Sequence, residues 1–456
     1  MLKVIDPTRG TPLHEFPIDD SATVELILKT AAETFKTWRE ATFAERGAVL
    51  KNVAQYMRDN IASLALLMTE EMGKPIKEAR AEVNKSAWCA KHYAEHAQSY
   101  LAPETIASDA ARSYVQYLPL GTILGNLPWN APFWLAFRYC APALMAGNTC
   151  VMKHDSHVPA CSRAIAEIFE KVNAPAGIFQ SLMVKSPAIE AIIRDPRIQA
   201  ISLTGSEKAG SAAAAIAASE IKPAVLELGG SDPCVVLADA DLEKAADIIT
   251  LSRIINAGQS CIAVKRIIVE EPVYDQMVSL LKERLAALKV GDPRQESTDI
   301  GPIARSDLRE DLHRQVEETV AAGAKCLLGG KLPEGDGFFY PVTLLVDVTP
   351  EMTAFREETF GPVAAVTRAR DETHAMELAN DTPYGLAASI WTETARGQAL
   401  ARQFAAGQVA VNGIVKTDPR LPSGGIKRSG YGRELGPHGI REFVNAQQIW
   451  IGPAKN

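Results

Sequence analysis

The chain has 456 residues, of which 47% are hydrophobic and 23% are charged, a composition typical of globular proteins and unlike that of disordered or coiled-coil chains. Its 48 basic and 55 acidic residues leave a net charge of −7, and the two signs are interspersed, which argues against nucleic acid as a partner. At roughly 150 residues per domain, the length predicts two or three units, each with its own core.

Seven cysteines are scattered through the chain without a C-x-x-C pair. An odd number at this spacing fits neither a disulfide framework nor a zinc ribbon. We therefore expect a reducing compartment and at most one chemically special thiol. The first residues, MLKVIDPTRG, lack the apolar segment of a secretory signal, so the sequence predicts a cytoplasmic protein.

Residues 113–137 carry no charge over 25 residues, a length sufficient to span a bilayer. The stretch also contains three prolines and two asparagines, and lipid does not accommodate the broken, polar backbone that these residues produce. We expect this segment to be buried inside the protein and no membrane to be a partner.

Residues 20–100 place apolar side chains at steps of three and four, which predicts a layer of amphipathic helices. From residue 120 onward, short apolar runs alternate with helical stretches, beginning with TILGNL, CVMK, FQSLMV, AISLT and AVLEL. This alternation predicts βαβ units and a parallel sheet covered on both faces. A second alternating region after Pro233 contains CVVLA, RIIV, CLLG, TLLV and SIWT. The sequence therefore predicts two α/β lobes, divided near residue 230 at the turn LGGSDP.

The string HYAEH at residues 92–96 has the spacing of an inverted zinc-protease motif, which sets two histidines one helical turn apart. No other feature of the sequence supports a metal site. Solvated histidines on an amphipathic helix are the simpler interpretation, and we expect no metal.

The run AISLT leads directly into Gly205, Ser206 and an alanine-rich helix. A helix N-terminus after a strand offers free N–H groups and a positive dipole end to a phosphate. The G-x-x-x-x-G spacing differs from the usual dinucleotide fingerprint, and a capped helix that needs a glycine turn has the same pattern. Both a nucleotide site and a simple helix cap remain open from these residues.

Cys261 ends the small, polar run NAGQSC and is followed by Lys265 and Arg266. This setting favours a partly exposed thiol biased toward thiolate, whereas cysteines in apolar runs are expected in the core. Glu227 ends an apolar strand immediately before two glycines. A carboxylate at that place suits a general base, although a structural ion pair is the commoner role.

Six motifs resemble those of the aldehyde dehydrogenase superfamily in their order and spacing: PWNAP, TGSEKAG, LELGGSDP, NAGQSC, EETFGP and GGIKRSGYGRE. The resemblance covers nearly the whole chain. It implies an α/β fold with a Rossmann-like NAD(P)-binding domain at 1–99 and 119–229, an α/β catalytic domain at 230–435, and a small β oligomerisation element at 100–118 and 436–456. It also implies a homodimer or a homotetramer.

The resemblance implies that Cys261 attacks an aldehyde carbon, and that the side-chain amide of Asn130 and the backbone N–H of Cys261 stabilise the oxyanion. Hydride then passes to a nicotinamide. Glu227 activates the water that hydrolyses the thioester and releases a carboxylic acid. A coenzyme A-acylating relative and a non-catalytic relative are the alternatives, and the presence of all three residues together favours the hydrolytic enzyme.

Family members bind their cofactor through positions occupied here by Trp129, Lys153, Ser156, Gly205, Ser206, Glu358 and Phe360. The small hydroxyl of Ser156 leaves room and a donor for a 2′-phosphate, whereas an acid at that position would repel one. Asp155, one residue away, acts in the opposite direction. We expect NADP as the favoured cofactor, with NAD also possible.

Arg138 lies eight residues after Asn130, as in succinate-semialdehyde dehydrogenases, where an arginine can present a forked donor to a substrate carboxylate. With other segments, it implies a bacterial enzyme of that group acting on succinic semialdehyde. A structural arginine remains an alternative. Ala131 and Ser423 stand where the family usually has phenylalanine, so we expect a wider, more polar pocket. A bulkier or aromatic aldehyde and relaxed specificity therefore remain open.

Overall fold

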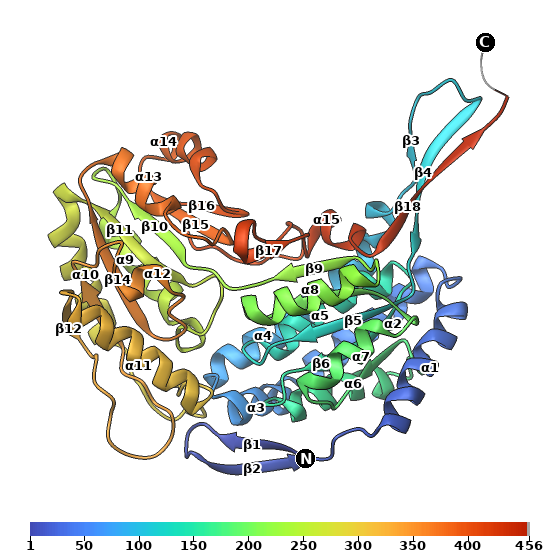
Figure 1. The fold of residues 1–456 in the computed structure, drawn as a ribbon, viewed down its shortest axis with the longest axis horizontal. Helices are drawn as coiled ribbons and strands as arrows, with labels where there is room; N and C mark the ends of the chain where they lie inside the picture. The colour runs from blue at the N-terminus through green and yellow to red at the C-terminus, as the bar shows by residue number, and fades with distance from the viewer. Residues whose placement is uncertain (454–456) are drawn as a thin grey trace.

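The computed structural model describes residues 1–453, which form two α/β lobes and a projecting β arm (Figure 1). The chain begins with a hairpin of β1 (Leu2–Asp6) and β2 (Thr11–Phe16). Four helices follow: α1 (Ser21–Trp38), α2 (Phe43–Asp59), α3 (Ile61–Met72) and α4 (Ile76–Tyr100). They confirm the predicted helical layer.

The first lobe contains a six-stranded sheet in the order β17-β9-β8-β5-β6-β7. Its parallel strands are β5 (Thr122–Leu127), β6 (Thr149–His154), β7 (Phe179–Ser181), β8 (Ile198–Thr204) and β9 (Ala224–Glu227). The intervening helices are α5 (Pro132–Met145), α6 (Pro159–Lys171), α7 (Ile189–Arg194) and α8 (Glu207–Ser219). The predicted βαβ units and parallel sheet are thereby confirmed for this lobe.

The second lobe contains a seven-stranded sheet in the order β12-β13-β14-β11-β10-β15-β16. Its strands are β10 (Asp232–Val236), β11 (Val264–Glu270), β12 (Lys325–Leu328), β13 (Thr343–Val346), β14 (Val363–Ala369), β15 (Ala387–Trp391) and β16 (Gln408–Val411). The edge strand β12 runs antiparallel to β13, and the other pairs are parallel. The apolar runs identified in the sequence predicted five of these strands and missed β14 and β16.

Helices of the second lobe are α9 (Leu242–Ile254), α10 (Tyr274–Ala286), α11 (Ser306–Ala321), α12 (Thr353–Arg356), α13 (Glu372–Asn380) and α14 (Thr394–Leu400). Short 3₁₀ helices lie at Ser186–Ala188, Ile255–Gly258, Glu271–Val273, Ala401–Gln403 and Lys427–Ser429.

The C-terminal segment returns from the second lobe to the first. Strand β17 (Gly430–Tyr431) pairs antiparallel with β9, placing Gly430 opposite Glu227. Helix α15 (Gly436–Arg441) then packs against α4 and α5. Residues 430–431 thus belong to the sheet of the first lobe, although the predicted boundary at 435 assigned them to the second. This return brings the end of the GGIKRSGYGRE motif next to Glu227.

The arm is a three-stranded antiparallel sheet of β3 (Glu104–Thr105), β4 (Arg112–Pro119) and β18 (Val444–Ile451), which extends away from both lobes (Figure 1). The uncharged stretch 113–137 forms β4, β5 and the start of α5, as expected of a segment that is not a membrane span. Within residues 1–453 no helix has both the length and the apolar character needed to cross a membrane.

Candidate active site

Cys261 follows a tight backbone turn in which three successive residues are left-handed. Asn256, Ala257 and Gly258 have φ values of 57°, 54° and 75°, a conformation that costs roughly 1–3 kcal/mol for each non-glycine residue. A Cβ on Gly258 would lie 2.2 Å from the carbonyl oxygen of Gly361, so only glycine fits there. Strain of this kind is common where a side chain must be presented to a reaction.

Arg253 connects this turn to the segment that carries the EETFGP motif. Its buried guanidinium donates hydrogen bonds to the carbonyl oxygens of Gly258 and Gly361, both at 2.7 Å, and of Thr359 at 3.3 Å. Because a single planar guanidinium group bonds both segments, it fixes the position of the loop before Cys261 relative to the loop after Glu358.

Lys265 contacts the nucleophile segment directly. Its fully buried ammonium donates to the carbonyl oxygens of Ser260, at 2.9 Å, and of Cys261, and lies 3.1 Å from Oε1 of Glu358. Burial raises the pKa of the Cys261 thiol to about 11, against the opposing positive charges of Lys265 and Arg138.

The environments of the seven cysteines differ as expected in part. Cys261 is partly exposed, while Cys89, Cys140, Cys150, Cys161 and Cys234 are buried. Cys326 is also exposed, so it is a second accessible thiol. The predicted thiolate bias of Cys261 is wrong. Although the residue is partly exposed, the surrounding protein desolvates its thiol, and this desolvation raises the pKa more than the charge of Lys265 lowers it.

Glu227 is buried at the end of β9. Its Oε2 accepts a hydrogen bond from Nη2 of Arg138 at 3.2 Å, and its Oε1 has no hydrogen-bond partner among residues 1–453. Burial raises the pKa of Glu227 to about 7, with Arg138 opposing this rise and the nearby Glu434 adding to it. A carboxyl group with this pKa can both release and accept a proton near neutral pH.

Arg138 is buried between two carboxylates. Its Nε and Nη2 both pair with Glu434, and Nη2 also reaches Glu227. The forked donor that the sequence assigned to a substrate carboxylate is therefore already charge-compensated, and these contacts match the structural alternative. Sequence reasoning missed Glu434, although it is the last residue of the GGIKRSGYGRE motif.

Asn130 lies beside the loop that precedes Cys261. Its side-chain Nδ2 donates to the carbonyl oxygen of Gln259 at 3.2 Å. The backbone carbonyl oxygen of Asn130 accepts hydrogen bonds from Lys74 Nζ and Asn256 Nδ2, both at 2.9 Å. The second N–H of the Asn130 amide remains available as a donor.

Lys153 is buried at the end of β6, and Ser156 is partly exposed three residues later. Between them, Asp155 accepts hydrogen bonds from the backbone N–H of His157 at 3.0 Å and pairs with its ring Nδ1 at 2.5 Å. Burial opposes the ionisation of Asp155, but the contacts with His157 outweigh it and lower the pKa of Asp155 to about 2. The negative charge near Ser156 is thus partnered by His157.

Ser206 is the N-cap of α8, with its side chain accepting from the backbone N–H of Ala209 at 3.3 Å. This confirms the helix-cap interpretation without excluding a phosphate at the same helix end. Gly205 donates its N–H to the carbonyl oxygen of Glu227 at 3.0 Å. The space beside Gly205 is open, since a Cβ there would meet only Leu203, at 3.7 Å.

Trp129 and Phe360 pack edge to face, with ring centroids 5.8 Å apart and planes at 89°. Two residues before Phe360, the carboxylate of Glu358 accepts a hydrogen bond from the backbone N–H of Gly230 at 3.2 Å. The structure therefore brings Trp129 and Phe360 together and places Glu358 on the same segment as Phe360. The cofactor cleft that the sequence assigned to these three residues stays a prediction.

The two substituted pocket positions are both close to catalytic candidates. Ala131 is the N-cap residue of α5, directly after Asn130, and is partly exposed. Ser423 is buried, and its backbone exchanges hydrogen bonds with Glu434 at 2.7 and 2.8 Å. The wider pocket expected from these two small residues stays a prediction.

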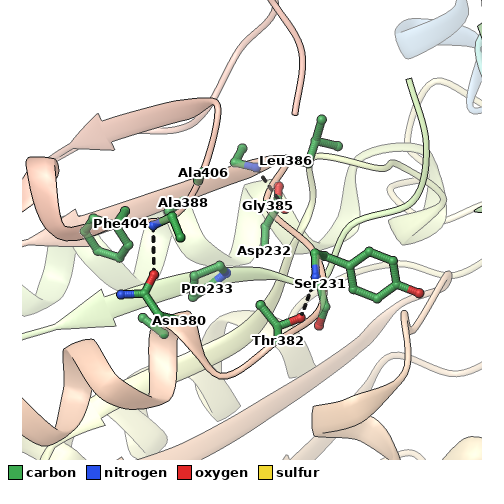
Figure 2. A pocket seen from close by; sticks show the side chains of 14 residues that line it. Ser231, Asp232, Pro233, Asn380, Thr382, Gly385, Leu386, Ala388, Phe404 and Ala406 are labelled. Carbon is green, nitrogen blue, oxygen red and sulfur yellow. Dashed lines mark hydrogen bonds between the residues drawn. The ribbon is translucent and has the colours of Figure 1, made fainter. Parts of the chain in front are cut away.

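A separate small cavity lies at the start of β10 (Figure 2). It has a volume of about 10 Å³ and is lined by Asp232, among other residues. Oδ1 of Asp232 accepts from the N–H of Ala387 at 3.1 Å, while Oδ2 has no partner within residues 1–453. Room for about one water-sized group is too little for an aldehyde, so this cavity is distinct from the candidate site.

The HYAEH segment lies on α4. Nε2 of His92 is 3.0 Å from the hydroxyl of Tyr100, and the rings of His92 and His96 are 4.5 Å apart. His96 is exposed as expected, but His92 is buried, and burial lowers its pKa to about 4. In the described part of the chain, no three His, Cys, Asp or Glu side chains are grouped to hold a metal ion.

Comparisons with known proteins agree with this arrangement. The model of the aldehyde dehydrogenase family matches residues 1–449. A probable NADP⁺ succinate-semialdehyde dehydrogenase of Synechocystis is 48% identical over 99% of both chains, and an NADP⁺ succinate-semialdehyde dehydrogenase of Mycobacterium avium is 45% identical over 100% of this chain and 98% of its own. A crystal structure of the Streptococcus pyogenes succinic semialdehyde dehydrogenase with NADP⁺ superposes with a TM-score of 0.97 at 33% identity, covering 99% of this chain and 100% of the other. This chain belongs to the aldehyde dehydrogenase family.

Proposed function

We propose that this enzyme oxidises succinic semialdehyde to succinate with NADP⁺ as the hydride acceptor. The observation that carries this proposal is the position of Cys261, whose thiol lies within the electrostatic influence of Lys265, Arg138, Glu227 and Glu358. The relatives described above, which are named for this substrate and cofactor, support the choice of both.

In the proposed first half-reaction, the Cys261 thiol releases its proton to water, and the thiolate attacks the aldehyde carbon and forms a thiohemiacetal. The free N–H of the Asn130 amide and the backbone N–H of Cys261 stabilise the oxyanion. Lys265 holds the Cys261 carbonyl and thereby sets the direction in which the thiol points. Loss of hydride from the same carbon leaves a thioester on Cys261.

In the second half-reaction, Glu227 accepts a proton from water as that water attacks the thioester carbon. Succinate leaves, and the Cys261 sulfur takes back a proton. A pKa of about 7 for Glu227 supports this role, because the carboxylate form is well populated at neutral pH. The presence of this base also favours hydrolysis over acyl transfer to coenzyme A.

The cofactor site is formed by the residues that the family resemblance assigns to it. Lys153 and Ser156 would hold the adenosine ribose and its 2′-phosphate, and the exposed N-terminus of α8 at Gly205 and Ser206 would hold the pyrophosphate. Trp129 and Phe360 would flank the nicotinamide, and Glu358 its ribose. When bound, the nicotinamide supplies the hydride-accepting carbon. The open space at Gly205 and the partnering of Asp155 by His157 support NADP⁺ at this site, with NAD⁺ as a weaker alternative.

A second candidate function is oxidation of bulkier or aromatic aldehydes. The observation that favours it is the small size of Ala131 and Ser423, both close to catalytic candidates. Restoring the ring with Ser423→Phe should then lower kcat/KM for benzaldehyde relative to succinic semialdehyde.

The arm supports a homodimer or homotetramer. It extends away from both lobes and exposes Ile106, Trp450 and Ile451, which are 52%, 46% and 42% exposed. Pairing with another subunit would cover these side chains and the sheet edges. Light scattering measures the number of subunits per particle for the full chain and for a chain that ends at residue 443. An unchanged number of subunits in the shortened chain would contradict this role of the arm.

The function itself is tested by incubating the enzyme with NADP⁺ or NAD⁺ and a panel of aldehydes while recording absorbance of the reduced cofactor. We expect the highest kcat/KM for succinic semialdehyde with NADP⁺, and a loss of at least roughly 1,000-fold in Cys261→Ala. Binding of NADP⁺ without turnover of any aldehyde by the wild type would contradict an enzymatic role.

A further inference from the structure

Lys85 is a partly buried cation near the candidate site that pairs with no carboxylate within residues 1–453. It lies on α4, one turn after Glu82, and its Nζ donates to the hydroxyl of Thr417 at 2.6 Å. The same Nζ is 4.1 Å from the ring centroid of Trp134. None of the ion pairs formed within residues 1–453 includes Lys85.

Three other cations around the candidate site have a carboxylate partner, and Arg253 instead donates to backbone carbonyl oxygens. Lys74 pairs with Glu82, Lys265 with Glu358, and Arg138 with both Glu227 and Glu434. A partly buried ammonium group without such a partner is incompletely compensated, and an incoming anion supplies the missing negative charge. Lys85, whose Nζ meets the hydroxyl of Thr417 and the ring of Trp134, has no carboxylate partner within residues 1–453 and can therefore meet an anionic ligand.

The helix contacts place Lys85 beside the start of α5, close to Asn130. Glu82 accepts the backbone N–H groups of Phe133 and Trp134, which ties α4 to the start of α5 just after Asn130. Trp134 and Arg138 are four residues apart and lie on one face of α5. This face leads from Lys85 to the carboxylate of Glu227.

We propose that Lys85 binds the distal carboxylate of the substrate, with the hydroxyl of Thr417 as a second donor and the ring of Trp134 packing against the substrate's methylene groups. This inference rests on the proposed function and names the side chain that selects an ω-carboxylated aldehyde. It assigns to Lys85 the task that the sequence had assigned to Arg138, whose charge is already compensated.

The charge of Lys85 depends on pH in a range that experiments reach. Burial lowers the pKa of Lys85 to about 8, helped by repulsion from Arg138 on α5 and opposed by Glu82 and Cys89 on α4 and by Asp418 next to Thr417. The ammonium form thus predominates below pH 8 and is lost above it.

The test compares two aldehydes that differ only at the far end, succinic semialdehyde and butanal, at saturating NADP⁺. In Lys85→Met, we expect the ratio of kcat/KM for succinic semialdehyde to that for butanal to fall by roughly 10- to 100-fold, mainly through KM for succinic semialdehyde. Lys85→Arg keeps the charge and should retain most of the preference. Lys91→Met removes an exposed lysine of the same helix, which pairs with Glu95 at 3.8 Å, and should leave the ratio unchanged.

A second readout uses the pH dependence of the same ratio. In the wild type the ratio should decline above pH 8, whereas in Lys85→Arg it should stay level to pH 10. Changes in Cys261 or Glu227 ionisation affect both aldehydes and cancel in the ratio.

Two results overturn the inference: a Lys85→Met enzyme that keeps the wild-type preference, and one in which both aldehydes lose efficiency equally, as a purely structural lysine would produce. Failure of the proposed function is seen separately, in the wild type alone, as a lack of preference for succinic semialdehyde over butanal.

Discussion

Arg138 donates a hydrogen bond to Glu227, with 3.2 Å between Nη2 and Oε2 and both side chains buried. Because the same guanidinium pairs with Glu434, only part of its charge acts on Glu227. Glu227, the candidate base, is therefore a buried acid that shares the positive charge of Arg138 with a second carboxylate. Its pKa of about 7 reflects burial offset by a shared positive charge.

Glu434→Gln should shift the pH dependence of catalysis toward acid. Glu434 raises the pKa of Glu227, and its removal also leaves Arg138 to act on Glu227 alone. More Glu227 is then ionised at pH 6, so we expect the ratio of kcat at pH 6 to kcat at pH 8 to rise above the wild-type value. Glu167→Gln, which alters an exposed pair with Arg163, should leave the ratio unchanged. An unchanged ratio in Glu434→Gln would show that Glu434 does not influence the ionisation of Glu227.

Lys265→Met should slow alkylation of Cys261. Lys265 is the strongest influence that lowers the thiol's pKa, so its loss leaves less thiolate at a given pH, roughly tenfold less for each unit of pKa. The rate of iodoacetamide labelling at pH 8.5 measures this directly. Because Cys326 is also exposed, both proteins should carry Cys326→Ser. Equal labelling rates would show that Lys265 only shapes the loop.

His157→Ala should weaken the preference for NADP⁺ over NAD⁺. The ring of His157 pairs with the carboxylate of Asp155. In the absence of this ring, the negative charge of Asp155 is unpaired near Ser156, where we propose that the 2′-phosphate binds. We expect the ratio of kcat/KM for NADP⁺ to that for NAD⁺ to fall by about five- to tenfold. Asp155→Asn in the same background should restore it. A ratio that is insensitive to both substitutions would place the selectivity elsewhere.

Arg253→Met should destabilise the fold by about 3–5 kcal/mol, because several buried carbonyl oxygens lose their only charged donor. Urea denaturation followed by fluorescence gives this value. Arg163→Met, on an exposed face of α6, should cost less than about 1 kcal/mol. Comparable stabilities of the two variants would show that the hydrogen bonds of Arg253 to the two loops do not stabilise the fold.

Much of the architecture follows from local sequence patterns. Apolar periodicity predicted the helical layer of residues 20–100, the parallel sheet of the first lobe and five strands of the second. Of the missed strands, β14 has seven residues and β16 has four, so length alone does not explain why they were missed, whereas β17 has only two residues. The pairing of β17 with β9 depends on the return of the chain between lobes, which no local pattern encodes.

The candidate site was predictable where a motif carries the chemistry, as for Cys261, Glu227 and Asn130. It was less so where charges pair over long distances in the sequence. Arg138 and Glu434 are 296 residues apart, and their contact changes Arg138 from a free donor into a compensated one. Likewise, neighbouring basic residues suggested a thiolate at Cys261, whereas burial, a property of the folded chain, determines the sign of the shift.

The two-stage use of Cys261 and Glu227 is tested most directly in Glu227→Gln. Rapid mixing of this variant with succinic semialdehyde and NADP⁺ should release about one NADPH per active site in a burst, followed by turnover at least roughly 100-fold slower than wild type. Mass spectrometry of the quenched protein should find a succinyl group on the peptide containing Cys261. Absence of both burst and adduct, or steady turnover at the wild-type rate, would contradict a thioester that depends on Glu227 for hydrolysis.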